Sequence, residues 1–381
     1  MTRVLIDASN LKVGGGVQVA ASFIEELIQL MKDPEYLREW PWLDSVMIDA
    51  SSSVVNQLPM SARAHVTLKN RTWRSAFDRR RNRLLSARFT VFGPFYGKAN
   101  ARIHIMGCAD VTLLSPHPSG VPPLPLPTRI KRHIRKPIAA HSFKSADVLV
   151  TETDAIRKHL VDHLAISPRS IEVVPNAIHE IFRHPERWLP LPLPKTDPGT
   201  VRLAYVARAY PHKNIDFLGS LGAAVLQMYG TRLQFLLTLH DSEWSGLSSL
   251  TKTYACNVGE LSIGQVPTLL SQCDGVIFPS LLEAFSATPL EGMALGKAVY
   301  ASNRDFVRTV CADYPIYFDP LDPTSAAHTV ASHIASCRHQ ALDHDAAKRP
   351  TAHTWTARDR ALAYIRIIDS SMKNCPPAHD S

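Results

Sequence analysis

The segment DGVIFPSLLEAFSATPLEGMALGKAVYAS (residues 274–302) predicts a strand, a loop, a short helix and a second strand. Residues 275–280 form an apolar run bounded by turn residues, as in a strand buried on both faces of a parallel sheet. Thr288 is a suitable N-cap, Pro289 suits the first helical position, and Gly296 can end the helix. A helix that starts beyond the carboxyl end of a parallel strand presents unpaired N–H groups, which favour an anion such as a diphosphate.

Two glutamates lie in this segment, eight residues apart. Glu291 follows Thr288 by three positions, so its carboxylate is either the capping-box partner of Thr288 or a ligand contact, and the spacing favours neither. Glu283 lies in the loop before the helix, where the alternatives are a solvated carboxylate and a ligand-binding group. The pair therefore marks a candidate ligand site at one edge of the expected sheet.

Strands and helices alternate through both halves of the chain, which indicates parallel sheets covered by helices. We expect an α/β fold of two Rossmann-like domains that face each other across a ligand-binding cleft. The expected strands are 3–7, 45–50, 65–68, 89–92, 102–106, 147–151, 170–176, 202–208, 233–239, 275–280 and 298–302. The expected helices, besides the short one that carries Glu291, are 17–31, 155–164, 215–229, 265–273 and 352–372.

The domain boundaries follow from composition. Residues 191–200 are rich in proline and predict a stiff linker. This linker would join an N-terminal domain, residues 1–190, to a C-terminal domain, residues 201–350. Residues 351–373 predict a helix that can pack back on the N-terminal domain, and residues 374–381 predict a disordered tail.

The charge of the chain is uneven. The net charge of +8 arises in residues 1–180, where 24 Lys and Arg outnumber 16 Asp and Glu. Basic residues alternate with Trp, Phe and Leu at 71–89 and form a second cluster at 129–136. Such segments suit an anionic membrane surface, and the alternative is a solvated helix face. Nucleic acid is not an expected partner, because no nucleic-acid-binding motif accompanies the charge.

The six cysteines are scattered without metal-ligand spacing, which is typical of free thiols in a reducing compartment. The amino terminus opens directly into a strand and does not resemble a signal peptide. No run approaches the ~18 apolar residues that a membrane span requires. We therefore expect a cytoplasmic protein whose membrane contact, if it has any, is peripheral.

Two cations follow the first strand of the second half. Arg208 ends the expected strand and Lys213 lies five residues later, within ARAYPHKN (207–214). This loop and the loop with Glu283 both follow parallel strands, so they face the same edge of the sheet. Arg208 could bind a diphosphate through its fork and Lys213 as a point charge, and the alternative is two solvated cations.

These motifs resemble those of retaining glycosyltransferases of family 4, the glycosyltransferase group 1 type with the GT-B fold. Residues 278–299 are similar to the E-x7-E signature, 205–214 to the G-R-x-x-x-x-K loop, 173–178 to the P-N-G segment and 14–16 to the Gly-rich first loop of that family. The resemblance implies a metal-independent enzyme that moves a sugar, with retention, from a nucleotide-diphosphate sugar to a lipid-linked or polysaccharide acceptor. Cell-surface polysaccharide biosynthesis is the expected setting.

The resemblance also implies roles for single residues. Glu291 would hold the ribose hydroxyls, Glu283 would contact the donor sugar, and Arg208 and Lys213 would neutralise the leaving diphosphate. A histidine of the first domain would lie beneath the donor sugar, and His104 is its first candidate, with His117 as the alternative. The other donor-binding residues that the resemblance implies are Gly15, Gly16, Gly259, Glu260, Leu261, Ser286, Ala287 and Thr288.

Three glycines of the family pattern are replaced, by Ala177, Ala207 and Ser286. Each replacement adds a Cβ at a conformationally permissive position, so the alternative function is a catalytically inactive homologue that binds nucleotide or acts as a scaffold. No cofactor or metal is expected, because the one D-x-D match, at 343–345, lies in a helical stretch. An NAD-dependent oxidoreductase is disfavoured, because the glycine loop at 14–16 lacks G-x-G-x-x-G spacing.

Overall fold

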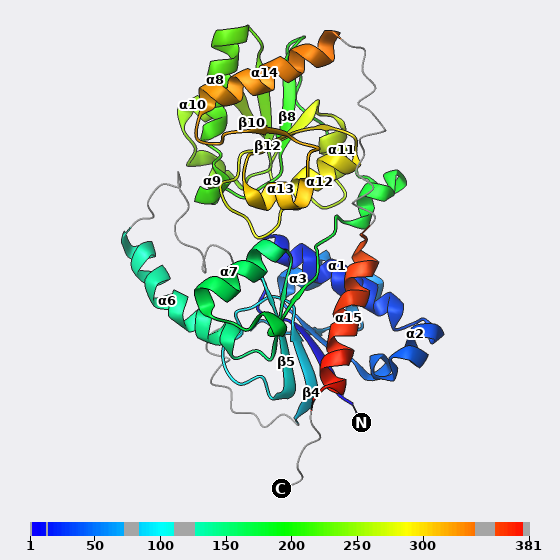
Figure 1. The fold of residues 1–381 in the computed structure, drawn as a ribbon. Coiled ribbons are helices and arrows are strands. Elements are labelled where there is room, and N and C mark those ends of the chain that lie inside the picture. Colours follow the sequence, from blue (N-terminus) through cyan, green and yellow to red (C-terminus); the bar gives the residue numbers. More distant parts are fainter. Residues whose placement is uncertain (1, 13, 72–83, 110–125, 340–354, 376–381) are drawn as a thin grey trace. The chain divides into compact units, whose positions relative to one another are not determined.

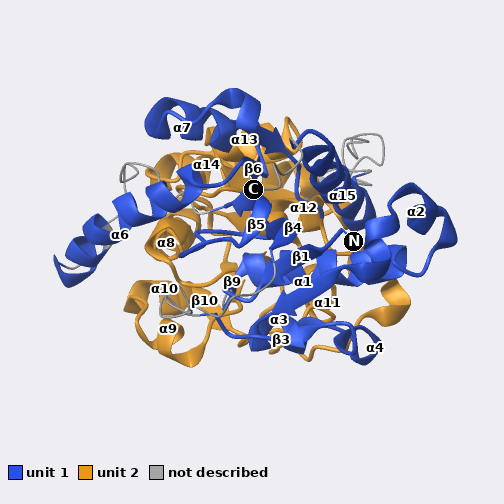
Figure 2. Cartoon of the chain, turned by 90° about the horizontal axis from the view of Figure 1, so that it is seen from below, with its two compact units in different colours: residues 1–115, 124–177, 355–381 blue, residues 116–123, 178–354 orange. Residues whose placement is uncertain are grey.

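The structure, a computed structural model, describes residues 2–12, 14–71, 84–109, 126–339 and 355–375. It divides into two compact units, which have different colours in Figure 2. Unit 1 contains the described residues up to 177 and residues 355–375, and unit 2 contains residues 178–339. Each unit has one parallel sheet with helices around it (Figure 1), which confirms the expected α/β class of two Rossmann-like domains.

Unit 1 has a seven-stranded sheet in the order β3-β2-β1-β4-β5-β6-β7, and all its strand pairs are parallel. The strands are β1 (Val4–Ala8), β2 (Met47–Ala50), β3 (Thr67–Leu68), β4 (Leu85–Thr90), β5 (Ala101–Cys108), β6 (Val148–Thr151) and β7 (Ile171–Val173). The α-helices are α1 (Gly15–Leu30), α2 (Pro34–Glu39), α3 (Ser52–Gln57), α4 (Met60–Arg63), α6 (Leu126–Lys144), α7 (Asp154–Leu164) and α15 (Ala357–Lys373). Short 3-10 helices are η1 (Pro41–Ser45) and η3 (Pro168–Ser170).

Unit 2 has a six-stranded parallel sheet in the order β10-β9-β8-β11-β12-β13. The strands are β8 (Val201–Tyr205), β9 (Leu233–Leu237), β10 (Ala255–Asn257), β11 (Gly275–Phe278), β12 (Ala298–Ser302) and β13 (Ile316–Phe318). The α-helices are α8 (Phe217–Tyr229), α9 (Asp241–Ser245), α10 (Ser249–Tyr254), α11 (Val266–Ser271), α12 (Ala287–Ala294), α13 (Asp305–Cys311) and α14 (Pro323–His339). Short 3-10 helices are η4 (Glu180–Arg183), η5 (Pro185–Arg187) and η6 (Pro211–Lys213).

Apolar strands that are covered on both faces form the core of each unit. Strands β1 and β12 are buried along their whole length, as expected for parallel strands between helix layers. In unit 1 the core also includes the C-terminal helix α15. The ring of Tyr364 on α15 packs edge-on against Phe23 of α1, with 5.0 Å between the ring centroids. Helix α15 is therefore an integral part of unit 1, far from the rest of that unit in sequence.

The proline-rich stretch 191–200 does not separate the two units. The division falls between residues 177 and 178, earlier than the expected boundary at 190, and Ile178 already joins the apolar core of unit 2. Leu189 donates its backbone N–H to the carbonyl of Gly264 at 2.9 Å, and its own carbonyl accepts from Thr268 Oγ1 at 2.7 Å. The prolines keep the chain extended, while the leucines between them pack on unit 2.

The strand order of unit 2 explains where a ligand site can form. From β8 the chain adds β9 and β10 on one side, then returns to place β11 on the other side of β8. At such a switch point the loops that leave the two central strands diverge and leave space at the carboxyl edge of the sheet. The loop after β8 carries Arg208 and Lys213, and the loop after β11 carries Glu283.

Candidate active site

Lys213 and Glu283 form an ion pair at the switch point of unit 2. Lys213 Nζ lies 2.5 Å from Glu283 Oε1, and the two side chains are 14% and 9% exposed. Their loops are joined by the backbone, because Leu281 donates its N–H to the carbonyl of His212 at 2.8 Å. Asn214 follows in the left-handed conformation, with φ of 56°, and its amide donates to Pro279 O at 3.3 Å. The sequence prediction that both loops meet at one sheet edge therefore agrees with the structure.

The buried Tyr205 connects the two loops. Its hydroxyl donates to the backbone carbonyl of Lys213 at 3.1 Å and shares a hydrogen bond of 2.8 Å with Ser280 Oγ. Complete burial raises the pKa of the Tyr205 phenol well above its ordinary value, and the nearby charge of Glu283 raises this pKa further. The phenol is therefore neutral, and its hydrogen bonds link the loop after β8 to the loop after β11.

Arg208 is held by two carboxylates. Its Nε lies 3.0 Å from Glu243 Oε1, and its Nη1 lies 2.8 Å from Glu260 Oε1. The hydrogen bond with Glu243 is the largest cause that raises the pKa of Arg208. Glu243 was missed in the sequence because it lies 35 positions from Arg208 and belongs to no site motif; its only local signal is a capping box with His240 at the start of α9.

Glu291 lies within α12 and does not form a capping box. The N-cap of α12 is Ser286, and the hydroxyl of Thr288 donates instead to Val206 O on the loop after β8, at 3.1 Å. Glu291 is 6% exposed, and burial raises its pKa to about 7. Among the described residues its carboxylate has no hydrogen bond or ion pair. A buried carboxyl group without a partner is costly, which identifies Glu291 as a candidate ligand contact and removes the capping alternative.

The start of α12 has no side-chain cap. Ala287 and Thr288 form the first turn, and no side chain caps the N–H groups that this turn leaves unpaired. Ser286 has φ of −132°, which any residue adopts, and neither Ala177 nor Ala207 is among the residues with positive φ. The three replaced glycines therefore leave the local backbone unstrained.

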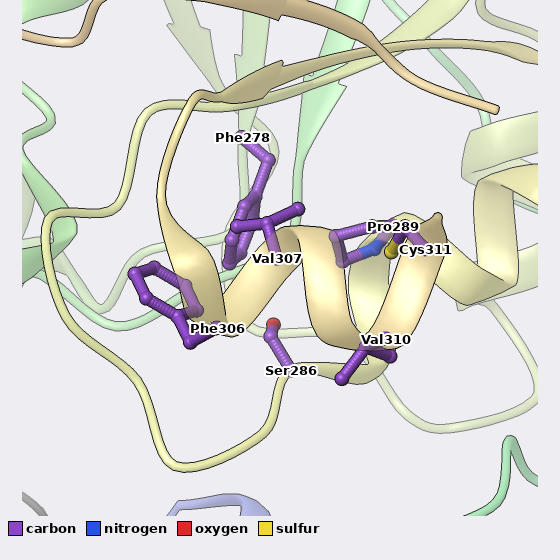
Figure 3. Close-up of a pocket in the computed structure, with 7 residues that line it drawn as sticks. All are labelled: Phe278, Ser286, Pro289, Phe306, Val307, Val310 and Cys311. Carbon is purple, nitrogen blue, oxygen red and sulfur yellow. The ribbon is translucent and has the colours of Figure 1, made fainter. Parts of the chain in front are cut away.

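A small pocket lies on the flank of α12, against α13 (Figure 3). Ser286 contributes the only side-chain oxygen of its lining, and the other lining groups are apolar or a thiol. The lining residues are Phe278, Ser286, Pro289, Phe306, Val307, Val310 and Cys311.

The segment Gly259, Glu260, Leu261 follows β10 on the same edge of the sheet. Gly259 has φ of 79°, a conformation that favours glycine. Glu260 reaches Arg208, and Leu261 packs on the core of unit 2. Asn257 fixes the turn, because its side-chain oxygen accepts from the N–H of Gly259 at 3.4 Å. The expected base-binding segment thus lies beside Arg208.

In unit 1 the glycine loop and His104 have different surroundings. Gly15 and Gly16 open α1, and a Cβ placed on Gly15 would meet no atom within 4 Å. His104 lies inside β5, is 4% exposed and shares a 3.0 Å hydrogen bond with Thr90 Oγ1. Burial, with the charge of Arg88, lowers the pKa of His104 to about 4. His104 is therefore a satisfied core histidine in this structure, and it is not available to a sugar. His117 lies outside the described residues.

The two basic segments also differ. Residues 72–83 lie outside the described residues, and the end of segment 71–89 is the buried strand β4. Arg88 is 7% exposed and its Nη1 lies 2.9 Å from Asp7 Oδ2, so the expectation that this part forms a membrane surface is wrong. Segment 129–136 lies on α6. None of the helices that the structure describes is long and apolar enough to cross a membrane.

The described residues contain no cluster of three or more His, Cys, Asp or Glu that could hold a metal ion. Residues 343–345, with the D-x-D match, lie outside the described ranges.

Comparison with known proteins identifies the fold. Residues 247–348 match the family model of glycosyl transferases group 1. No curated protein sequence matches the chain. A glycosyltransferase from Rickettsia africae ESF-5 is similar in structure, with a TM-score of 0.63, 13% identity and coverage of 98% of this chain and 99% of that chain. The Anabaena protein Alr3699/HepE, in complex with UDP and glucose, has a TM-score of 0.61 at 13% identity, with coverage of 98% and 100%. Sucrose-phosphate synthase from Thermosynechococcus elongatus has a TM-score of 0.60 at 13% identity, with coverage of 98% and 97%.

The matched residues contain Glu283, Glu291 and the whole of α12, which are the parts of the site that the sequence motif marked. The structural similarity extends over both units. Residues 247–348 thus match the family model of glycosyl transferases group 1, and the two α/β units of the chain have the GT-B fold.

Proposed function

We propose that this protein is a retaining, metal-independent glycosyltransferase that moves a sugar from a nucleoside diphosphate sugar to a lipid-linked or polysaccharide acceptor. One observation carries this proposal. The Lys213–Glu283 pair, Arg208, the buried Glu291 and the open start of α12 all belong to the carboxyl edge of one sheet, around β8 and β11. Cations beside a helix start suit a diphosphate, and carboxylates suit the hydroxyls of ribose and sugar.

The reaction needs negative charge to be stabilised as the nucleoside diphosphate leaves. Lys213 and the N–H groups at the start of α12 would supply this stabilisation, together with Arg208. An oxocarbenium-like transition state would form at the sugar, and the leaving phosphate would take the proton of the acceptor hydroxyl. No protein nucleophile is required for this step. Glu283 would instead hold Lys213 in place and accept a hydrogen bond from a hydroxyl of the donor sugar.

Glu291 is suited to the ribose of the donor. Its carboxyl group is buried in α12, and burial alone raises its pKa to about 7. Two ribose hydroxyls that donate to it would favour the charged form, because hydrogen bonds to a carboxylate lower its pKa. The ligand would then supply the hydrogen bonds that the described residues do not.

A UDP-sugar is the first donor to test. Solved structures of the Anabaena protein Alr3699/HepE contain UDP and glucose, or UDP-glucose, on the same fold. The fold does not select the acceptor, because sucrose-phosphate synthase shares it. The polysaccharide or lipid-linked acceptor therefore rests on the basic composition of residues 1–180.

Donor binding and turnover are tested separately. UDP-glucose and the GDP, ADP and dTDP analogues are titrated by calorimetry, and transfer of labelled sugar to membrane lipid and polysaccharide fractions is measured. Lys213→Ala and Glu291→Ala are expected to lower transfer by about 100-fold or more. The control is Lys195→Ala, an exposed lysine that precedes β8 and so does not belong to the carboxyl edge.

Absence of donor binding by the unaltered protein would overturn the proposal. Binding of a nucleotide sugar without transfer to any acceptor would instead support the nucleotide-binding scaffold. Transfer that survives in Glu291→Ala at the unaltered rate would remove Glu291 from the site.

A further inference from the structure

Helix α6 of unit 1 carries a row of exposed apolar side chains. Leu126, Ile130, Ile134 and Ile138 repeat every fourth residue and are 66%, 52%, 59% and 51% exposed. A helix turns by about 100° per residue, so each of these four residues is rotated by about 40° from the one before it. The four side chains therefore form one continuous stripe along the helix. Large apolar side chains gathered in this way mark an interaction surface, unlike single exposed leucines.

The stripe faces away from the rest of unit 1. Among the side chains of α6 that the structure describes, those that are buried lie in its last turns, and they are Ala139, Ser142 and Phe143. Ser142 Oγ donates to Phe95 O at 2.6 Å. At about 100° per residue Ala139 and Phe143 lie about 160° from the centre of the stripe, whereas Ser142 follows Ile138 one turn later and ends the row where α6 meets unit 1. Helix α6 projects from unit 1 in Figure 1 and again in Figure 2.

The charge of α6 is of one sign. Residues 126–144 contain six Lys and Arg and neither Asp nor Glu. Among the cations, Arg129, Lys131, Arg135 and Lys136 are exposed beside the stripe. An apolar stripe flanked by cations is the pattern of a helix that lies in the plane of a membrane interface.

We propose that α6 docks the protein on an anionic lipid surface, with its apolar stripe in the acyl boundary and its cations at the headgroups. A second copy of α6 does not fit the stripe, because it would bring one set of cations against another. Nucleic acid would neutralise the cations but leave the stripe in water. This docking goes beyond the proposed sugar transfer and does not depend on it, since no site residue of unit 2 takes part.

The experiment is flotation of the full-length protein with vesicles of phosphatidylcholine, with and without phosphatidylglycerol. We expect binding to the anionic vesicles at low salt and weaker binding at high salt. Ile130→Ser with Ile134→Ser keeps every charge and removes half of the stripe, so we expect about tenfold weaker binding or more. Arg135→Gln with Lys136→Gln keeps the stripe, and we expect about tenfold weaker binding to anionic vesicles only.

The matched control is Leu250→Ser with Leu321→Ser, which removes two leucines that are 44% and 45% exposed in unit 2. We expect this control to bind as the unaltered protein does. Melting temperature and UDP-glucose binding are measured for every variant and should not change, since the altered α6 side chains are exposed. Equal vesicle binding by the Ile130/Ile134 variant overturns the proposal. A concentration-dependent dimer in sedimentation that this variant abolishes also overturns it, because the stripe would then belong to a second copy.

Discussion

Glu243 fixes the guanidinium of Arg208 to the backbone that follows it. One oxygen, Glu243 Oε1, accepts from Arg208 Nε at 3.0 Å and from the N–H of Ala209 at 3.2 Å. The other oxygen accepts from the N–H of His240 at 3.1 Å and closes the capping box of α9. Glu260, in contrast, contacts only the outer Nη1 of Arg208 and is 52% exposed. The two carboxylates therefore differ: Glu243 holds Arg208 and the adjoining backbone, and Glu260 contacts only the outer nitrogen of Arg208.

Glu243→Gln and Glu260→Gln should consequently have different effects on donor binding. In Glu243→Gln the charged bond that orients Arg208 is lost, and we expect the Kd for a UDP-sugar to rise by about fivefold, corresponding to ~1 kcal/mol for a partly exposed pair. Glu260→Gln frees Nη1, so the Kd should stay the same or fall. Calorimetric titration of both variants measures this difference. Equal losses of affinity in the two variants would contradict the positioning role of Glu243.

The buried pair of Lys213 and Glu283 should couple strongly in stability. Lys213→Met alone leaves the carboxylate of Glu283 without its cation, and Glu283→Gln alone leaves the ammonium without its anion. We expect each single change to cost about 3 kcal/mol, and the double change to cost less than their sum, because no unpaired buried charge remains. Unfolding of the four proteins in urea gives the coupling free energy. Additive losses would mean that water screens the ion pair, which would contradict the low exposure of the two side chains, 14% for Lys213 and 9% for Glu283.

The sequence predicted the parts of the fold that depend on local pattern. The strand expected at 298–302 has these bounds in the structure, because an apolar run between Gly296 and a polar loop has few alternatives in a parallel sheet. Arg88 shows where local pattern fails. It belongs to a basic stretch in sequence, yet it lies in a buried strand because Asp7, 81 residues earlier, pairs with it. Charge composition cannot predict such a distant partner.

For the candidate site, motif spacing selected Glu283, Glu291, Arg208 and Lys213, and the structure brings the loops of Lys213 and Glu283 together at one edge of the sheet. The roles of these four residues in donor binding stay predictions. The assignment of Thr288 as N-cap was wrong, because its hydroxyl bonds Val206 O, a contact that only the packing of α12 on β8 creates. In all these cases the missing information is tertiary.

Removal of the Tyr364 ring from α15 tests whether the C-terminal helix stabilises unit 1. Tyr364 is 3% exposed and packs on Phe23 and Phe89, each with 5.0 Å between ring centroids. Tyr364→Ala should therefore lower the free energy of unfolding by about 3–5 kcal/mol. Met228→Ala, at a side chain that is 47% exposed, is the control and should change it by less than about 0.5 kcal/mol. Thermal unfolding followed by circular dichroism measures both, and similar effects would contradict the packing of α15.

The pH dependence of the stability of Glu291→Gln should reveal the free-energy cost of burying the charged carboxylate of Glu291. Burial raises the pKa of Glu291 from 4.5 to about 7, so the folded protein holds this proton more tightly than the unfolded chain does. The resulting stabilisation is present below pH 4.5 and is lost as the pH rises to about 7. Glutamine has no proton to lose, so near pH 8 the variant should be more stable by up to roughly 3 kcal/mol.

The sign of this effect distinguishes burial from other consequences of the substitution. The melting temperature of Glu291→Gln should exceed that of the unaltered protein near pH 8, and the difference should shrink towards zero near pH 5. Glu260→Gln, at a side chain that is 52% exposed, is the matched control and should show no such trend. A difference that stays constant with pH would mean that the carboxyl group of Glu291 is solvated in the folded protein. A saturating UDP-sugar should also reduce the difference near pH 8, because ribose hydroxyls that donate to the carboxylate of Glu291 stabilise its charged form.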